Sequence, residues 1–145
     1  MGFHFRETMS GELTLDDAPY GSPPLAIRFH VTARSGPLRR YLEGEPLTLE
    51  GRVSVDGIAE ERPLQGHLEI GLPLRRQLVY NFEFLGDDGT RYRFHGQKNV
   101  SYLRFSRSMT TLYGSLYRGD ARVGRALVRF DLRDLPSFLA SWRPY

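Results

Sequence analysis

The chain has 145 residues, of which 40% are hydrophobic and 12% aromatic, and its net charge is +3 at pH 7. This length fits a single domain, residues 1–145, and the apolar content is enough for a core, which excludes a disordered chain. Cysteine is absent, which excludes disulfides, thiolate metal sites and a cysteine nucleophile. Because neither a membrane-spanning apolar run nor a secretory signal is visible, we expect a soluble cytoplasmic protein without a membrane span.

Alternation of apolar and polar residues dominates the chain and indicates strands that each turn one face to a core. Between these segments lie glycine-, proline- and aspartate-rich turns such as "GDDG", residues 86–89, which is typical of a tight hairpin. In chain order, the alternating segments are residues 3–15, 25–34, 47–55, 63–72, 77–86, 91–100 and 110–130, the last holding two strands around a turn at Arg118–Asp120.

Helical periodicity appears in only two places. "GPLRRYLEGE", residues 36–45, predicts one or two turns, with Pro37 at the first helical position and Gly44 at the end. "RDLPSFLASW", residues 133–142, predicts a short C-terminal helix that packs on the sheet.

Glycine recurs in the middle of the strands, mostly on the apolar face. A glycine there costs stability and usually allows a sheet to bend, as barrels require. About eight strands with short connections therefore predict an all-β, antiparallel barrel of the lipocalin or calycin type, and a two-sheet sandwich is the alternative. The glycines in question are Gly11, Gly51, Gly66, Gly96, Gly114 and Gly124.

The segment "RYRFHGQKNV", residues 91–100, raises the question of function. Its apolar face carries Gly96 and then Lys98, the only lysine in the chain. Either the lysine ends the strand and extends to water at the rim, or it holds the anionic or carbonyl head group of a ligand inside the barrel. In the second case the candidate ligand-binding residues are Lys98, Tyr80, Phe82, Phe84, Tyr92, Phe94 and Tyr113.

Other chemistry has little support in the sequence. The four histidines lie on polar strand faces without metal-ligand spacing, so no metal site is predicted. There is no nucleophile elbow or nucleotide-binding fingerprint, no cofactor is expected, and the paired carboxylates fall in predicted turns. Because the arginines are scattered along the chain, we expect a solvated outer face and no nucleic-acid partner.

The run "FHGQKNVSYLRFSRSMTTLYGSLYRG" resembles a pattern in a β-rich accessory region of some large bacterial GMC-type, cholesterol-oxidase-like oxidoreductases. "FRETMSGEL", near the N-terminus, resembles the start of that region. In the family pattern an acidic residue precedes the threonines, whereas Ser108 and Met109 stand there here. The flavin-binding motif and catalytic histidine of the oxidoreductase part are absent. The resemblance implies a module that accompanies the oxidation of lipid-like substrates, and the residues that match its pattern are Gly96, Lys98, Thr110, Thr111, Leu112 and Tyr113.

Three hypotheses follow for the function, and the sequence favours a non-enzymatic one. The first is a barrel that binds a small hydrophobic, lipid-like ligand near Lys98. The second is an interaction module that docks to an enzyme or associates with itself. The third is a small barrel isomerase or cyclase that works near Lys98, His95 or a tyrosine.

Overall fold

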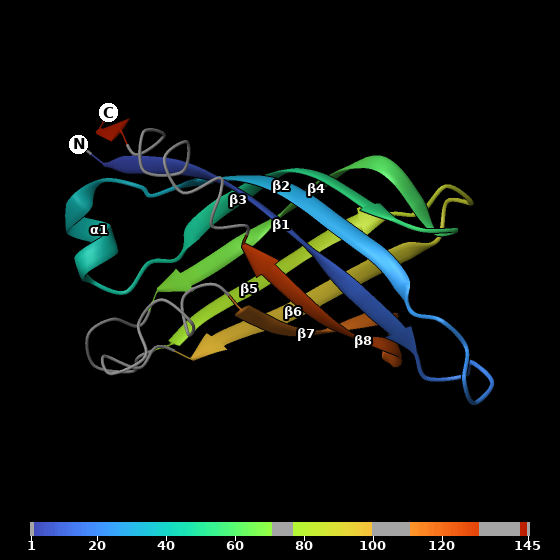
Figure 1. Ribbon diagram of the computed structural model, residues 1–145. Helices are drawn as coiled ribbons and strands as arrows, with labels where there is room; N and C mark the ends of the chain where they lie inside the picture. The colour runs from blue at the N-terminus through green and yellow to red at the C-terminus, as the bar shows by residue number, and fades with distance from the viewer. Residues whose placement is uncertain (1, 71–76, 100–110, 131–142, 145) are drawn as a thin grey trace.

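The computed structural model describes residues 2–70, 77–99, 111–130 and 143–144 (Figure 1). Strands dominate these residues, as the alternation predicts. In chain order the elements are β1 (Phe3–Leu15), β2 (Leu25–Arg34), α1 (Leu38–Leu42), β3 (Leu47–Val55), β4 (Ala59–Ile70), β5 (Gln77–Leu85), β6 (Arg91–Asn99), β7 (Thr111–Arg118), β8 (Ala121–Phe130) and β9 (Arg143–Pro144).

Strands β1 to β8 form a closed antiparallel barrel. Each strand from β2 to β8 pairs with its neighbour in the sequence, and β1 pairs with both β8 and β2. Gly11, for example, lies opposite Ile27 on one side and Val128 on the other. The predicted barrel is confirmed, and because both edges of β1 are used, the sandwich alternative is wrong.

The two ends of the barrel differ. Tight turns join β3 to β4, β5 to β6 and β7 to β8 at one end, which we call the hairpin end. Helix α1 lies at the other end, where β2 ends and β3 begins, and we call this the α1 end (Figure 1). Strand β6 runs toward the α1 end and β5 runs away from it, so Lys98 and Tyr80 both lie nearer to that end.

Helix α1 confirms the first predicted helix, although Pro37 precedes it rather than opening it. Gly44 follows the helix with a φ of 95°, a conformation that glycine adopts without strain. The second predicted helix, residues 133–142, lies outside the described residues. Within the described part of the chain, no helix is long and apolar enough to cross a membrane.

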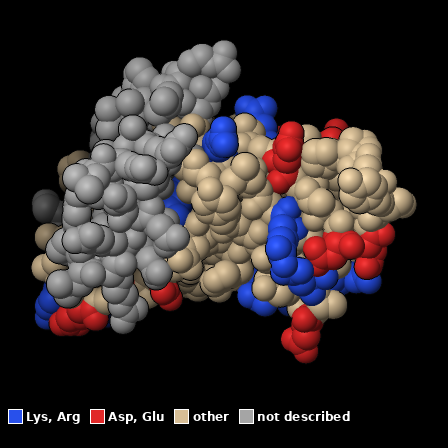
Figure 2. All heavy atoms as spheres, turned by 60° about the horizontal axis from the view of Figure 1, so that its bottom comes forward, with Lys and Arg blue, Asp and Glu red and all other residues tan. Residues whose placement is uncertain are grey.

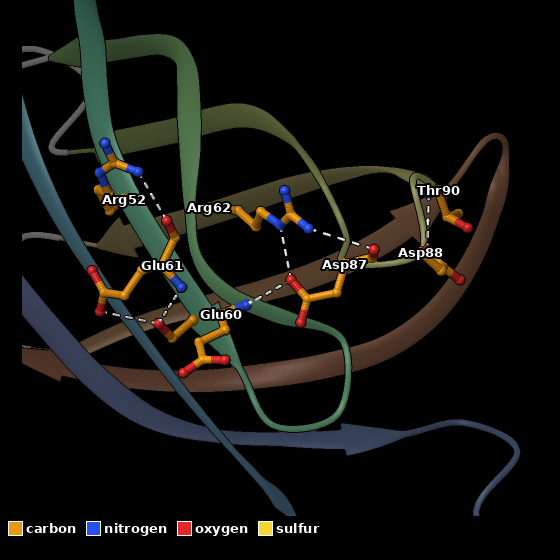
Figure 3. Close-up of polar contacts among 8 residues, drawn as sticks. Arg52, Glu60, Glu61, Arg62, Asp87, Asp88 and Thr90 are labelled. Carbon is orange, nitrogen blue, oxygen red and sulfur yellow. Dashed lines mark hydrogen bonds and ion pairs between the residues drawn. The ribbon is translucent and has the colours of Figure 1, made fainter.

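Polar contacts tie the turns together at the hairpin end (Figure 3). The Asp87 carboxylate accepts hydrogen bonds from Arg62 Nε, at 2.8 Å, and from the Glu60 backbone N–H, at 3.1 Å. The bond from Arg62 is the main reason why the pKa of Asp87 is lowered. The Asp88 carboxylate accepts a hydrogen bond from the Thr90 backbone N–H, and this bond is the main reason why the pKa of Asp88 is also lowered. Asp87 therefore holds the start of β4, and Asp88 holds the backbone of its own turn, as residues of this type commonly do.

The pair Glu60–Glu61 corrects one expectation, because it lies in β4 and not in a turn. Glu61 has a φ of 48°, close to the point where the β3–β4 register shifts between Val53 and Val55. This irregularity lets the Glu61 backbone N–H bond to Ser54 and its carbonyl accept from Arg52 (Figure 3). The Glu61 carboxylate also accepts a hydrogen bond from the Ser54 hydroxyl, at 3.2 Å, so this residue holds a local bend in the strand.

Two facing glycines make room for a core ring. Gly96 of β6 lies opposite Gly114 of β7. A Cβ atom added at Gly96 would be 2.7 Å from one Phe94 ring atom, and one at Gly114 would press on the same ring. The glycines predicted to bend the sheet therefore also free the space that Phe94 fills.

We expect Gly114→Ala to lower the free energy of unfolding by about 1–3 kcal/mol, because the new methyl group overpacks the ring of Phe94. Urea unfolding measures this change. Gly36→Ala is the matched control, since its Cβ would meet only the end of the flexible Glu45 side chain at 3.2 Å, and its expected change is within about 0.5 kcal/mol. Phe94→Leu added to Gly114→Ala should recover part of the loss, and equal effects of the two alanines would contradict this account.

Candidate functional site

Three phenylalanine rings fill the middle of the barrel. Phe29 of β2 lies with its ring centroid 5.3 Å from Phe82 of β5 and 5.7 Å from Phe94 of β6. Phe82 and Phe94 stack at 4.9 Å. Because these rings come from different sides of the barrel and touch each other, the middle section of the barrel is packed with side chains.

A second aromatic pair lies closer to the hairpin end. The rings of Phe84 and Tyr92 stack at 5.5 Å, and Phe84 in turn lies 6.2 Å from Phe82. These four predicted binding residues, Phe82, Phe84, Tyr92 and Phe94, therefore form one continuous core cluster.

The interior becomes polar on the side of this cluster toward the α1 end. Glu7 of β1, Tyr80 of β5 and Lys98 of β6 meet there inside the barrel, and they are 7%, 1% and 1% exposed. Lys98 Nζ lies 3.4 Å from Glu7 Oε2, while the Tyr80 hydroxyl donates a short hydrogen bond to Glu7 Oε1. We call these three residues the interior polar cluster.

The ammonium group of Lys98 is only partly satisfied by the described residues. It can donate three hydrogen bonds, and its only described acceptor is the Glu7 oxygen, at a long 3.4 Å. A cation–π contact with the Tyr80 ring, whose centroid is 5.1 Å from Nζ, adds electrostatic support. Glu7 is therefore the acceptor of Lys98 within the part of the chain that the structure describes.

Tyr80 is held in its neutral form. Burial raises the pKa of its phenol well above the usual value of 10.0, and the nearby negative charge of Glu7 and the bond to that carboxylate raise it further. The hydroxyl therefore remains a hydrogen-bond donor across the whole physiological range. Its bond fixes one Glu7 oxygen and leaves the other for Lys98.

The structure brings together six of the seven predicted site residues inside the barrel. Lys98 is buried against Glu7, so the alternative in which it extends to water at the rim is wrong. Tyr113 is the exception: it is 64% exposed on the outer face of β7 and does not line the interior. His95, one of the residues near which the enzyme hypothesis places its substrate, faces outward and lines an outer groove.

Sequence reasoning missed Glu7. A signal was present, because Glu7 stands between Phe5 and Met9 on the alternation face that enters the core. A carboxylate in that position predicts a buried polar partner elsewhere in the chain.

Metal binding has no support in the described residues, among which no group of three or more histidine, cysteine, aspartate or glutamate side chains is arranged to hold an ion. His30, one of the four histidines, instead shares a 2.7 Å hydrogen bond with the hydroxyl of Thr8. This pairing on the outer face agrees with the expectation of polar-face histidines.

Comparisons with known proteins add no family to this geometry. No family model, no curated protein and no solved structure matches the chain. The resemblance to the oxidoreductase accessory region therefore stays a prediction, and the function is inferred below from the residues themselves.

We expect Lys98→Met to lower the free energy of unfolding by about 3–5 kcal/mol, because it leaves the Glu7 carboxylate buried without its cation. Adding Glu7→Gln should recover most of this loss, since no charge then remains in the cluster. A double-mutant cycle by urea unfolding measures the coupling. Strictly additive losses would show that the two side chains do not interact.

Stability should fall as the pH rises past 10, because the folded protein keeps the Tyr80 proton that the unfolded chain releases. Between the pKa of tyrosine in the unfolded chain and its raised pKa in the folded protein, Tyr80 alone lowers the free energy of unfolding by up to about 1.4 kcal/mol per pH unit. Tyr80→Phe removes this part of the slope in urea unfolding at a series of pH values. Tyr20→Phe, at a fully exposed position, should leave the slope unchanged, and equal slopes in wild type and Tyr80→Phe would refute the assignment.

Proposed function

We propose that the protein is a non-enzymatic binding barrel for one small, mainly apolar molecule, whose neutral hydrogen-bond acceptor reaches Lys98 from the α1 end. The observation that carries the proposal is the buried Lys98 ammonium, whose donors outnumber the acceptors among the described residues. A bound acceptor would satisfy one of them in a setting where such a bond is strong.

Charge balance favours a neutral head group over an anion. Glu7 and Lys98 already offset each other across 3.4 Å. A carboxylate or phosphate would leave an excess negative charge in the barrel interior, at a high desolvation cost. A carbonyl or hydroxyl oxygen accepts from Lys98 without this cost.

The surroundings of the cluster favour an apolar body. Lys98 lies opposite Leu78, and Tyr80 lies opposite Leu68, both of which are buried. Farther in, the Phe29–Phe82–Phe94 cluster limits how deep a ligand can enter. At the same end of the barrel, α1 exposes Leu38 and Leu42, which are 49% and 75% exposed and offer an apolar surface to an arriving lipid-like molecule.

Native mass spectrometry of the freshly purified protein is the first test. We expect an added mass of a small neutral molecule that disappears on denaturation. Its identification gives the ligand class, and a retained anionic molecule instead would contradict the preference for a neutral head group.

Titration with octanol and octanoate tests the head group directly, because the two share one apolar chain. Octanol should bind the wild-type protein more tightly by calorimetry. Glu7→Gln with Lys98→Met, which keeps the charge balance, should weaken octanol binding by roughly 10- to 150-fold, the worth of a hydrogen bond to a charged donor.

The control for this titration is Arg52→Gln, an exposed position on the outer face of β3 that should not change octanol binding. If octanoate binds more tightly than octanol, or if the double variant binds octanol as well as wild type does, the proposed site is wrong.

A further inference from the structure

The outer face of β6, β7 and β8 has an unusual composition. These three strands contain no aspartate or glutamate. They do contain six arginines, all on the outside of the barrel or at strand ends: Arg91, Arg93, Arg118, Arg122, Arg125 and Arg129.

Only some of these arginines are engaged by acidic partners. Arg122 pairs with Asp16 at 2.8 Å. Among the described residues, none forms an ion pair with Arg93, Arg125 or Arg129. Arg125 and Arg129 are exposed on β8, about 13 Å apart along the strand, with Leu127 between them.

Exposed aromatic side chains lie among these arginines. Tyr113, which is 64% exposed, is the cross-strand neighbour of Leu127, itself 36% exposed. The guanidinium of Arg93 lies 4.5 Å from the ring centroid of Tyr117. The exposed pair Tyr113 and Leu127 lies between two exposed arginines. Such a surface fits a ligand whose flat rings are joined by negatively charged groups.

A shallow groove of about 420 Å³ runs beside Tyr113. Its floor includes the backbone of Gly114 and Ala126, which lie opposite each other and whose side-chain positions face the interior. Polar side chains that can bond to base edges, His95, Gln97 and Ser115, line it together with Tyr113 and Arg125. Figure 2 shows a stretch of uncharged surface with both basic and acidic side chains at its border. One exposed carboxylate, that of Glu12 on β1, is on the residue opposite Leu127.

We propose that this platform, the outer face of β6–β8, binds single-stranded nucleic acid. Tyr113 stacks on one base, and Arg125 and Arg129 contact the phosphates on either side. An exposed ring can stack only on a base that is itself unstacked, which favours a single strand over a duplex. An acidic peptide would use the arginines but would leave Tyr113 and the groove without a role.

This proposal reverses the expectation drawn from the scattered arginines. Arg93, Arg125 and Arg129 are spread over 37 positions of the chain, but the pairing of β6 with β7 and of β7 with β8 gathers them on one face. The platform lies on the opposite side of the barrel wall from the interior polar cluster, so its test is independent of the proposed ligand site.

Fluorescence anisotropy with end-labelled oligo(dT) and oligo(rU) tests the platform. We expect saturable binding. The logarithm of the binding constant should fall with the logarithm of the salt concentration with a slope of about −1.4, as two arginine–phosphate contacts imply. Tyr113→Ala should weaken binding roughly 5- to 150-fold. Arg125→Gln should weaken it and reduce the slope by about 0.7. Tighter binding of one oligomer shows whether the platform prefers DNA or RNA, and either preference supports the proposal.

Arg52→Gln is the matched control, because it removes the same charge from β3, away from the platform. Urea unfolding should show all variants folded, since the changed side chains are on the outer surface. The proposal is overturned if neither oligomer binds at low salt, if Arg52→Gln weakens binding as much as Arg125→Gln, or if Tyr113→Ala has no effect while polyglutamate competes as well as the oligomers.

Discussion

The pairing of β1 with both β2 and β8 is the constraint on which the rest of the structure depends. It closes the sheet, leaves no unpaired edge in the ring of eight strands, and sets the width of the interior. In this closed ring, a side chain of β1 meets those of β5 and β6 across the interior. The contact of Glu7 with Tyr80 and Lys98 is thus a product of closure as much as of those three residues.

The buried ion pair contributes more to the choice of register than to net stability. Removing two charges from water costs about as much as their attraction returns. A one-residue slip of β1, however, would turn Glu7 to the outside and leave Lys98 in the core without a counter-ion. Strands β1 and β6 each supply one member of this pair.

Much of the fold could be predicted from the sequence because a strand has a period of two and the turns carry glycine and aspartate. The strand and turn around residues 77–99 follow directly from that pattern. The partner of Lys98 could not be predicted in the same way, since Glu7 lies 91 positions away and only closure brings it near. Tyr113 was misassigned for a different reason: Leu112, Gly114 and Leu116 hold the inward face of β7, so the aromatic residue between them faces out. Likewise, the basic platform depends on strand register, which no local pattern specifies.

Strand β9 has a consequence for the way in which this barrel can be combined with other proteins. Its backbone pairs with the beginning of β1, Phe3 with Pro144 and His4 with Arg143, so the described chain enters and leaves the fold at one point (Figure 1). A domain of this kind can be spliced into a surface loop of a host protein, because the host loop needs to span only the distance between two paired strands. Both ends of the described chain lie at the α1 end of the barrel, and the hairpin turns lie at the opposite end.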